Sequence, residues 1–151
     1  MMAFALCLAL ATSRPAPDGA EVLRGCGIAT HTQAAAVAYD IPPTLLLAIA
    51  QQETRIRAVT NKGGYCGQFQ VHPRWAAPAT CADLQGEQGP WAAARLLAAY
   101  STRGGVQEAL RRYSGSAPGS HWYARQVLTR KRILDRAMPW TDHKHAAKDR
   151  T

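Results

Sequence analysis

The spacing of apolar residues along the chain predicts helices. An alanine-rich segment, residues 28–38, repeats its small apolar side chains at helical intervals. Asp40 then fits the N-cap of a second helix, and Pro42 or Pro43 suits its first turn, where the missing N–H of proline costs nothing. The apolar sequence TLLLAIAQQET, residues 44–54, continues this helix.

Three further helices are predicted in the second half of the chain. Pro90 opens one of them, and a Gly-Gly pair at 104–105 separates it from the next, which ends near Tyr113. The last begins near Ser120, after the loop sequence SGSAPGS. Alternation typical of strands is confined to GQFQVH, residues 67–72, which could form one arm of a short hairpin. The expected fold class is therefore mainly α, with at most a short β-hairpin.

Length and the first apolar run define the expected domains. A chain of 151 residues with 47% hydrophobic content forms one domain. Residues 1–11, MMAFALCLALA, are shorter than the roughly 20 residues that span a bilayer and end on small residues, as in a secretory signal. No Lys or Arg precedes them, so a buried helix or strand is the alternative. We expect a signal peptide and linker at 1–17, a domain at 18–136 and a basic tail at 137–151.

The four cysteines suggest a disulfide more readily than a metal site. Cys7 would be lost with the signal, and Cys66 and Cys81 both lie in the loop-rich middle of the chain, so we favour a bridge between them, with Cys26 left unpaired. Three free thiols are the alternative. The spacing of Cys66, His72 and Cys81 fits no paired zinc knuckle, and we expect neither a metal nor a cofactor.

The net charge of +8 and the pI near 9.8 indicate attraction to a polyanion. Nucleic acid, an anionic membrane and the acidic bacterial wall all qualify. The sequence contains no RNP aromatic pattern and no interleaving of basic and aromatic residues, so specific nucleic-acid recognition is not expected. Much of the excess charge lies in TRKRILDR and DHKHAAKDR, which are typical of a solvated helix face and a chain terminus.

Glu53 is the candidate for acid–base chemistry. It follows Leu46 by seven residues and Ile49 by four, so its side chain shares the core-facing stripe of the second predicted helix. Partial burial penalises the charged carboxylate and raises its pKa, which allows the group to carry a proton near neutral pH. The alternative is a solvated glutamate at a helix end.

The motifs around Glu53 resemble those of a known enzyme family. In order, YDIPPTLLLAIAQQET, GGYCGQFQVHP, EALRRYSGS and HWYARQVL look like the successive motifs of the soluble lytic transglycosylase catalytic domain, which is related to goose-type lysozymes. The resemblance covers roughly residues 28–134. It implies a single lysozyme-like helical domain and a periplasmic or secreted, wall-associated protein.

The first two motifs of the family carry its catalytic acid and a Gly-Leu-Met-Gln sequence. The resemblance assigns the acid to Glu53, and Thr54 stands where serine is usual. Gly67 and Gln70 match the outer positions of the second motif, while Gln68 and Phe69 replace Leu and Met. The amide at position 70 suits sugar hydroxyls, and the ring at 69 could form an apolar wall or belong to the core.

The later motifs supply tyrosines. Tyr113 matches the tyrosine of the family's Tyr-Asn-Ala-Gly sequence, Ser114 occupies the Asn position, and Tyr123 matches a later tyrosine. The resemblance thus implies a set of substrate contacts: Thr54, Gly67, Phe69, Gln70, Tyr113, Ser114 and Tyr123. A serine hydroxyl cannot duplicate an amide, which changes the expected sugar contacts. We expect the hydroxyl of Tyr113 to face Glu53 and fix its rotamer, with ordinary packing as the alternative.

The resemblance implies a single-acid cleavage of peptidoglycan that leaves 1,6-anhydro-N-acetylmuramic acid ends. A hydrolytic muramidase is the first alternative, because most glycosidases use two carboxylates and Asp83 or Glu87 could supply the second. An inactive wall-binding or assembly protein is the other. The implied partners are glycan strands and a secretion, conjugation or phage machine, and we expect a monomer without a stable membrane span.

Overall fold

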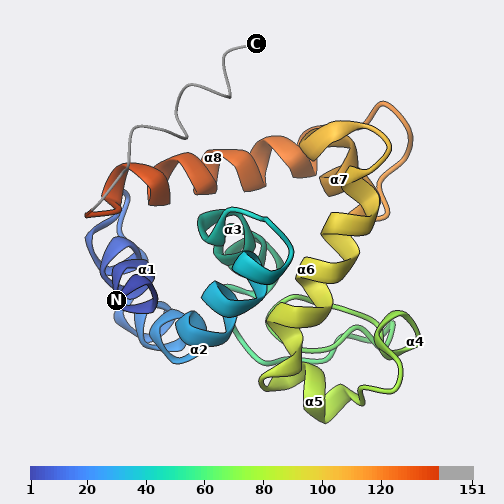
Figure 1. Ribbon diagram of the computed structural model, residues 1–151, viewed down its shortest axis with the longest axis horizontal. Coiled ribbons are helices and arrows are strands. Elements are labelled where there is room, and N and C mark those ends of the chain that lie inside the picture. The colour runs from blue at the N-terminus through green and yellow to red at the C-terminus, as the bar shows by residue number, and fades with distance from the viewer. Residues whose placement is uncertain (140–151) are drawn as a thin grey trace.

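The computed structural model describes residues 1–139 and confirms a mainly helical fold in this part of the chain (Figure 1). The helices are α1 (Met2–Thr12), α2 (Gly19–Ala38), α3 (Pro43–Thr54), α4 (Pro73–Ala76), α5 (Cys81–Gln85), α6 (Gln88–Ser101), α7 (Gly105–Tyr113) and α8 (Trp122–Ala137). None of these helices is both long and apolar enough to cross a bilayer. Most of the predicted basic tail, from residue 140 onward, lies outside the described residues.

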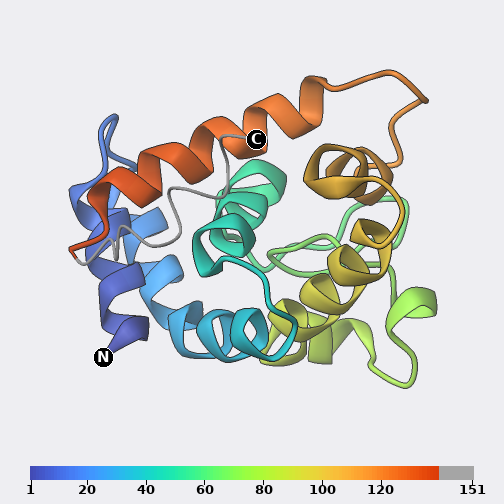
Figure 2. The same ribbon diagram turned by 45° about the horizontal axis from the view of Figure 1, so that its top comes forward.

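Helix α3 forms the centre of the fold. Figures 1 and 2 show it surrounded by α2, α6 and α8, with which it packs. Its residues from Thr44 to Gln51 are all buried, which is the pattern of a helix that contacts neighbours on every side. The helix starts at Pro43, one of the two prolines expected in its first turn, and ends at Thr54, after which Arg55 has a left-handed φ of 52°. Glu53 is therefore carried on the last turn of the most enclosed helix.

Asp40 ends α2 and does not cap α3, so its predicted capping role is wrong. The N-cap of α3 is Pro42. Asp40 has a φ of 52°, and its N–H bonds to the carbonyl of Val37 while the N–H of Ile41 bonds to that of Ala36. This is a Schellman motif, in which the residue after the helix adopts a left-handed conformation. Aspartate tolerates this conformation. The helix before it is also longer than the predicted 28–38.

The apolar N-terminal run forms a buried helix. Leu6 and Leu10 of α1 are fully buried, and a Cβ on Gly25 of α2 would lie 2.2 Å from Leu10 Cδ2, so the glycine admits this leucine. Cys7 bonds to Cys26, and the expectation that Cys26 is unpaired is therefore wrong in this structure. The sequence analysis interpreted this segment either as a secretory signal or as a buried helix or strand. Its conformation in the structure is that of a buried helix. The compact body thus includes residues that the sequence assigns to a signal peptide.

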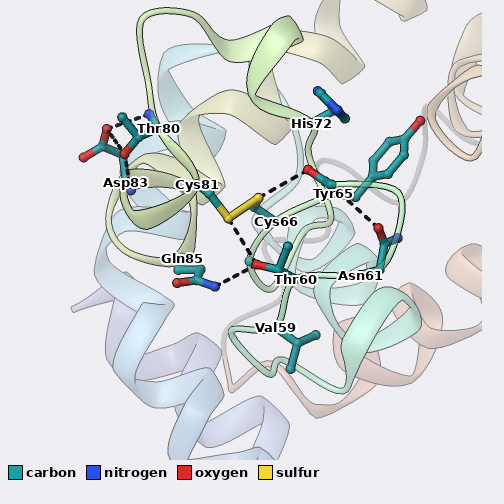
Figure 3. The surroundings of a disulfide bond; sticks show 12 residues. Val59, Thr60, Asn61, Tyr65, Cys66, His72, Thr80, Cys81, Asp83 and Gln85 are labelled. Carbon is teal, nitrogen blue, oxygen red and sulfur yellow. Dashed lines mark hydrogen bonds between the residues drawn. A yellow bond between two sulfur atoms is a disulfide. The ribbon is translucent and has the colours of Figure 1, made fainter.

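A loop between α3 and α4 replaces the predicted hairpin arm. The only β pairings among the described residues are isolated bridges that join Cys66 to Thr60 and to Val71. Cys66 also bonds to Cys81 at the start of α5, which is the pairing that the sequence favours (Figure 3). Beside the bridge, Gln85 Nε2 donates to Thr60 Oγ1 at 3.0 Å. The disulfide therefore ties the loop to the α5 region.

Removal of this disulfide is expected to destabilise the protein measurably. In the double variant Cys66→Ser/Cys81→Ser, the unfolded chain regains the freedom of a 15-residue loop, worth about 3 kcal/mol in the chain-entropy account. Urea unfolding without reductant measures the loss. Wild-type protein in reductant should lose at least as much, because the bridge between Cys7 and Cys26 opens as well. Equal unfolding midpoints for the variant and the oxidised wild type would contradict the prediction.

Candidate active site

A cleft of about 500 Å³ opens beside the end of α3. Five helices, α3, α4, α6, α7 and α8, and the loop after α3 contribute side chains, so segments distant in sequence meet at one site. Its lining comprises Glu53, Asn61, Tyr65, Gln70, Val71, His72, Arg74, Trp75, Leu96, Tyr100, Arg112, Tyr113, Ser114, Gly115 and Tyr123. Aromatic and polar side chains line the cleft together with a single carboxyl group, a composition suited to a ligand with both apolar faces and hydroxyl groups.

The carboxyl group of Glu53 is partly buried and hydrogen-bonded. Tyr123, on the first turn of α8, donates its O–H to Glu53 Oε1. Removal from water raises the pKa of Glu53 above its ordinary value of 4.5, and the hydrogen bond from Tyr123 opposes part of that rise. A carboxyl group in this environment holds its proton to a higher pH than an exposed one. It can therefore act as a proton donor in the cleft.

Tyr113 lies near Glu53, but its hydroxyl has another partner. It donates to the backbone carbonyl of Phe69 at 2.7 Å, so the expectation that Tyr113 fixes the Glu53 rotamer is wrong and Tyr123 makes that contact. Burial and the charge of Glu53 raise the pKa of both tyrosines well above 10. Both phenols therefore remain protonated donors at neutral pH.

The turn at residues 67–70 packs behind the cleft and is held there by hydrogen bonds to its carbonyl groups. The carbonyl of Phe69 accepts from Tyr113, and that of Gln68 accepts from Thr54 Oγ1 at 3.0 Å. Gln70 Nε2 donates to the carbonyl of Gly67 at 2.9 Å. Three successive carbonyls thus receive side-chain donors from α3, α7 and the turn itself, which holds this loop against the helices.

Three predicted substrate contacts lie outside the cleft lining. Phe69 is fully buried in the core, which matches its alternative interpretation, and Thr54 is buried with its hydroxyl bonded to the turn. Gly67 adopts a φ of +76°, and a Cβ there would lie 2.1 Å from the carbonyl oxygen of Leu84. These three residues determine the shape of the loop. Their buried positions keep them from contacting a ligand in the cleft.

Gln70 and Ser114 do line the cleft, as predicted. The amide N–H groups of Gln70 bond to the carbonyls of Val59 and Gly67, so its Oε1 is the atom left to accept from a ligand. Ser114 Oγ lies 2.6 Å from Ser116 Oγ and donates to the carbonyl of Arg111. Both side chains are held in place by the backbone around them.

Neither candidate for a second carboxylate lines the cleft. Asp83 forms a capping box with Thr80, whose hydrogen bonds lower the pKa of Asp83. Figure 3 shows it on the far side of the disulfide from Tyr65, which lines the cleft. The side chain of Glu87 is 75% exposed and lies 3.5 Å from His31. Glu53 is therefore the only carboxylate in this lining among the described residues.

Sequence reasoning missed several cleft residues and one buried acid. Arg74 and Trp75 line the cleft but fall outside the motifs used to predict it, and Arg112 lies within one of those motifs without having been predicted as a site residue. The Trp that follows His-Pro-Arg offered a weak signal, since an isolated aromatic near a motif is more often part of the core. The buried acid is Glu21, which lies in α2 and accepts a hydrogen bond from Gln51 Nε2 at 2.9 Å.

Substitution of Tyr123 by Phe tests its contact with Glu53. Loss of the hydrogen bond should raise the pKa of Glu53 further and move the alkaline limb of the pH–rate profile to higher pH. The maximal rate should fall roughly 10- to 100-fold, the range for a hydrogen bond to a charged group. Tyr100→Phe is the matched control, because Tyr100 lines the same cleft without a hydrogen bond to Glu53. A pH–rate profile identical to that of the control would contradict this role for Tyr123.

Within residues 1–139, no group of three or more His, Cys, Asp or Glu side chains is arranged to hold a metal ion. Comparison of the chain with protein-family models, with curated proteins and with solved structures finds no match.

Proposed function

We propose that this protein is a lytic transglycosylase that cleaves the β-1,4 bond between N-acetylmuramic acid and N-acetylglucosamine in peptidoglycan. The observation that carries the proposal is a solitary carboxyl group, Glu53, which lies in a polar and aromatic cleft, has a raised pKa and accepts a hydrogen bond from Tyr123. A reaction that needs one group to act first as acid and then as base fits a cleft with one carboxylate.

The reaction begins with proton transfer from Glu53 to the glycosidic oxygen. The bond from this oxygen to the anomeric carbon of the muramoyl residue breaks, and N-acetylglucosamine leaves as an alcohol. The substrate's own N-acetyl carbonyl stabilises the positive anomeric carbon. This step requires Glu53 to hold a proton at working pH, which its raised pKa supports.

The second step returns the proton to Glu53. The muramoyl 6-hydroxyl bonds to the anomeric carbon and gives its proton to the Glu53 carboxylate, which forms the 1,6-anhydro ring and restores the starting enzyme. No water is consumed, so no base is required on the opposite face of the sugar. The O–H of Tyr123 stabilises the carboxylate between the two transfers, because a hydrogen bond to the charged form favours that form.

The hydrolytic alternative has less support because it needs a second carboxylate to position water. Asp83 caps α5 and Glu87 is exposed beside His31, and neither lines the cleft. The variant Asp83→Asn/Glu87→Gln is therefore expected to clear a suspension of purified sacculi at the wild-type rate. A loss of clearing of the size expected for Glu53→Gln would favour hydrolysis. A wild-type protein that binds sacculi without clearing them would favour the inactive wall-binding alternative.

A further inference from the structure

Two side chains of α4, Arg74 and Trp75, line the cleft and take no part in the proton transfers proposed above. Trp75 is 51% exposed, although an indole ring would ordinarily bury most of its apolar surface. An exposed aromatic ring inside a cleft offers a flat apolar surface to a ligand. Tyr65, 36% exposed, adds a second such ring to the same lining.

The backbone of α4 is held in place while the side chains of Arg74 and Trp75 remain exposed. Pro73 starts the helix, and His72 Nδ1 accepts from the N–H of Arg74 at 3.2 Å. From α6, Arg95 Nη2 donates to the carbonyl of Trp75 at 2.9 Å. The exposed indole is therefore carried on an anchored turn, and a ligand would not have to order that turn on binding.

The charge of Arg74 is free to bind an anion. Its guanidinium carbon lies 4.7 Å from the centroid of the Trp75 ring, and it makes no ion pair with any described residue. Arg112, in the same lining, is bonded to Glu108 at 2.9 Å. Glu53, the acid of this lining, is bonded to Tyr123 and not to Arg74. Of the two arginines in the cleft, Arg74 is therefore the more available to a ligand.

We propose that Arg74 and Trp75 form a subsite for a sugar that carries a carboxylate. The indole packs against the apolar face of the pyranose ring, and the planar guanidinium pairs with the carboxylate. The inference rests on the proposed function, whose substrate has an acidic arm at the 3-oxygen of muramic acid. The carboxylate belongs either to the unsubstituted lactyl group or to a peptide attached to it.

Calorimetric titration of the Glu53→Gln protein, which binds without turnover, tests the subsite. The three ligands are chitotetraose, which is neutral, a tetrasaccharide of alternating N-acetylglucosamine and unsubstituted N-acetylmuramic acid, and the same tetrasaccharide with its peptides. We expect roughly 10-fold tighter binding of an acidic ligand than of the neutral one, the size of one charge-assisted hydrogen bond. Added Arg74→Gln should abolish this preference, so that the acidic ligands bind no more tightly than chitotetraose does to the same variant.

The two acidic ligands distinguish the sources of the carboxylate. If the unsubstituted tetrasaccharide also binds more tightly than chitotetraose, the lactyl carboxylate is the partner of Arg74. If only the peptide-bearing tetrasaccharide binds more tightly, the partner is a carboxylate of the peptide. Trp75→Ala should weaken all three ligands, and Trp75→Phe should restore part of that loss. The charge-matched control is Arg103→Gln, because Arg103 is exposed between α6 and α7, outside the cleft lining.

Failure of the subsite differs from failure of the proposed function. If Arg74→Gln keeps the ligand preference of the Arg103→Gln control while wild-type protein makes anhydro ends, the subsite is wrong and the function stands. If wild-type protein makes no anhydro ends but the preference depends on Arg74, the function is wrong and the acidic-sugar site stands. Absence of binding to all three ligands would overturn both.

Discussion

Replacement of Glu53 by glutamine is expected to slow the clearing of sacculi by at least about 10²- to 10⁴-fold, the range that general acid–base catalysis contributes. The amide keeps the size of the side chain and can still accept a hydrogen bond from Tyr123. It cannot deliver a proton to the glycosidic oxygen or take one from the 6-hydroxyl. Both steps of the proposed reaction are therefore lost, and the initial rate of turbidity decrease measures the effect.

The same substitution should also stabilise the protein as the pH rises. Because the pKa of Glu53 is raised above 4.5 in the folded state, the folded protein holds this proton more tightly than the unfolded chain. The stability that this proton contributes is full below the unfolded pKa and is lost as the pH rises through the folded pKa. Glutamine has no such dependence. The melting temperature of the variant relative to wild type should therefore increase from about pH 4.5 upward.

Glu87→Gln is the control for both effects, because this side chain is exposed and outside the cleft. It should clear sacculi at the wild-type rate, and it shows how much of any change in melting temperature comes from the loss of an exposed carboxylate. Clearing at the wild-type rate by Glu53→Gln would reject Glu53 as the proton donor. A difference in melting temperature between Glu53→Gln and wild type that stays constant from about pH 4.5 to neutral pH would contradict the raised pKa of Glu53.

Gly67→Ala should be the most destabilising small substitution in the loop that supports the cleft. A Cβ at this position would lie 2.1 Å from the carbonyl oxygen of Leu84 and 2.8 Å from its carbon, both of them backbone atoms that cannot rotate away. The φ of +76° adds strain for any residue with a Cβ. Together these effects should cost at least about 3 kcal/mol, or about 10 °C in melting temperature.

The control for this substitution is Gly27→Ala. A Cβ on Gly27 would meet no atom within 4 Å, and its helical position favours alanine by up to about 1 kcal/mol. The Gly27 variant should therefore melt at or above the wild-type temperature. Gly67→Ala should also lose lytic activity, because the carbonyls of the turn that it distorts accept hydrogen bonds from the hydroxyls of Thr54 and Tyr113. Equal melting temperatures for the two variants would show that the loop can relax around a side chain at position 67.

Local sequence patterns predicted the helix that carries the candidate acid. The apolar run before Glu53 and the proline at its start agree with α3, which begins at Pro43 and encloses its side chains on every face. The error at Asp40 also has a local origin. Aspartate suits both an N-cap and a left-handed helix ending, and a single sequence does not distinguish the two when helices are separated by so few residues.

Contacts between distant segments could not be predicted in this way. The sequence analysis predicted that Tyr113 contacts Glu53, whereas the packing of α7 and α8 brings Tyr123 to it instead. Similarly, the turn beginning at Gly67 looked like a sugar-binding motif, whereas its carbonyls accept hydrogen bonds from side chains of the surrounding helices. Polar side chains near an active site often support it from behind, and residue type alone does not reveal which side they face.

The chemistry of the newly formed glycan ends tests the central proposal most directly. Purified peptidoglycan is digested in water labelled with heavy oxygen, and the muramic acid ends are analysed by mass spectrometry. A lytic transglycosylase that uses Glu53 alone should produce 1,6-anhydro ends that are lighter than reducing ends by one water and carry no heavy oxygen. Reducing ends with one heavy oxygen, and no anhydro product, would contradict the account.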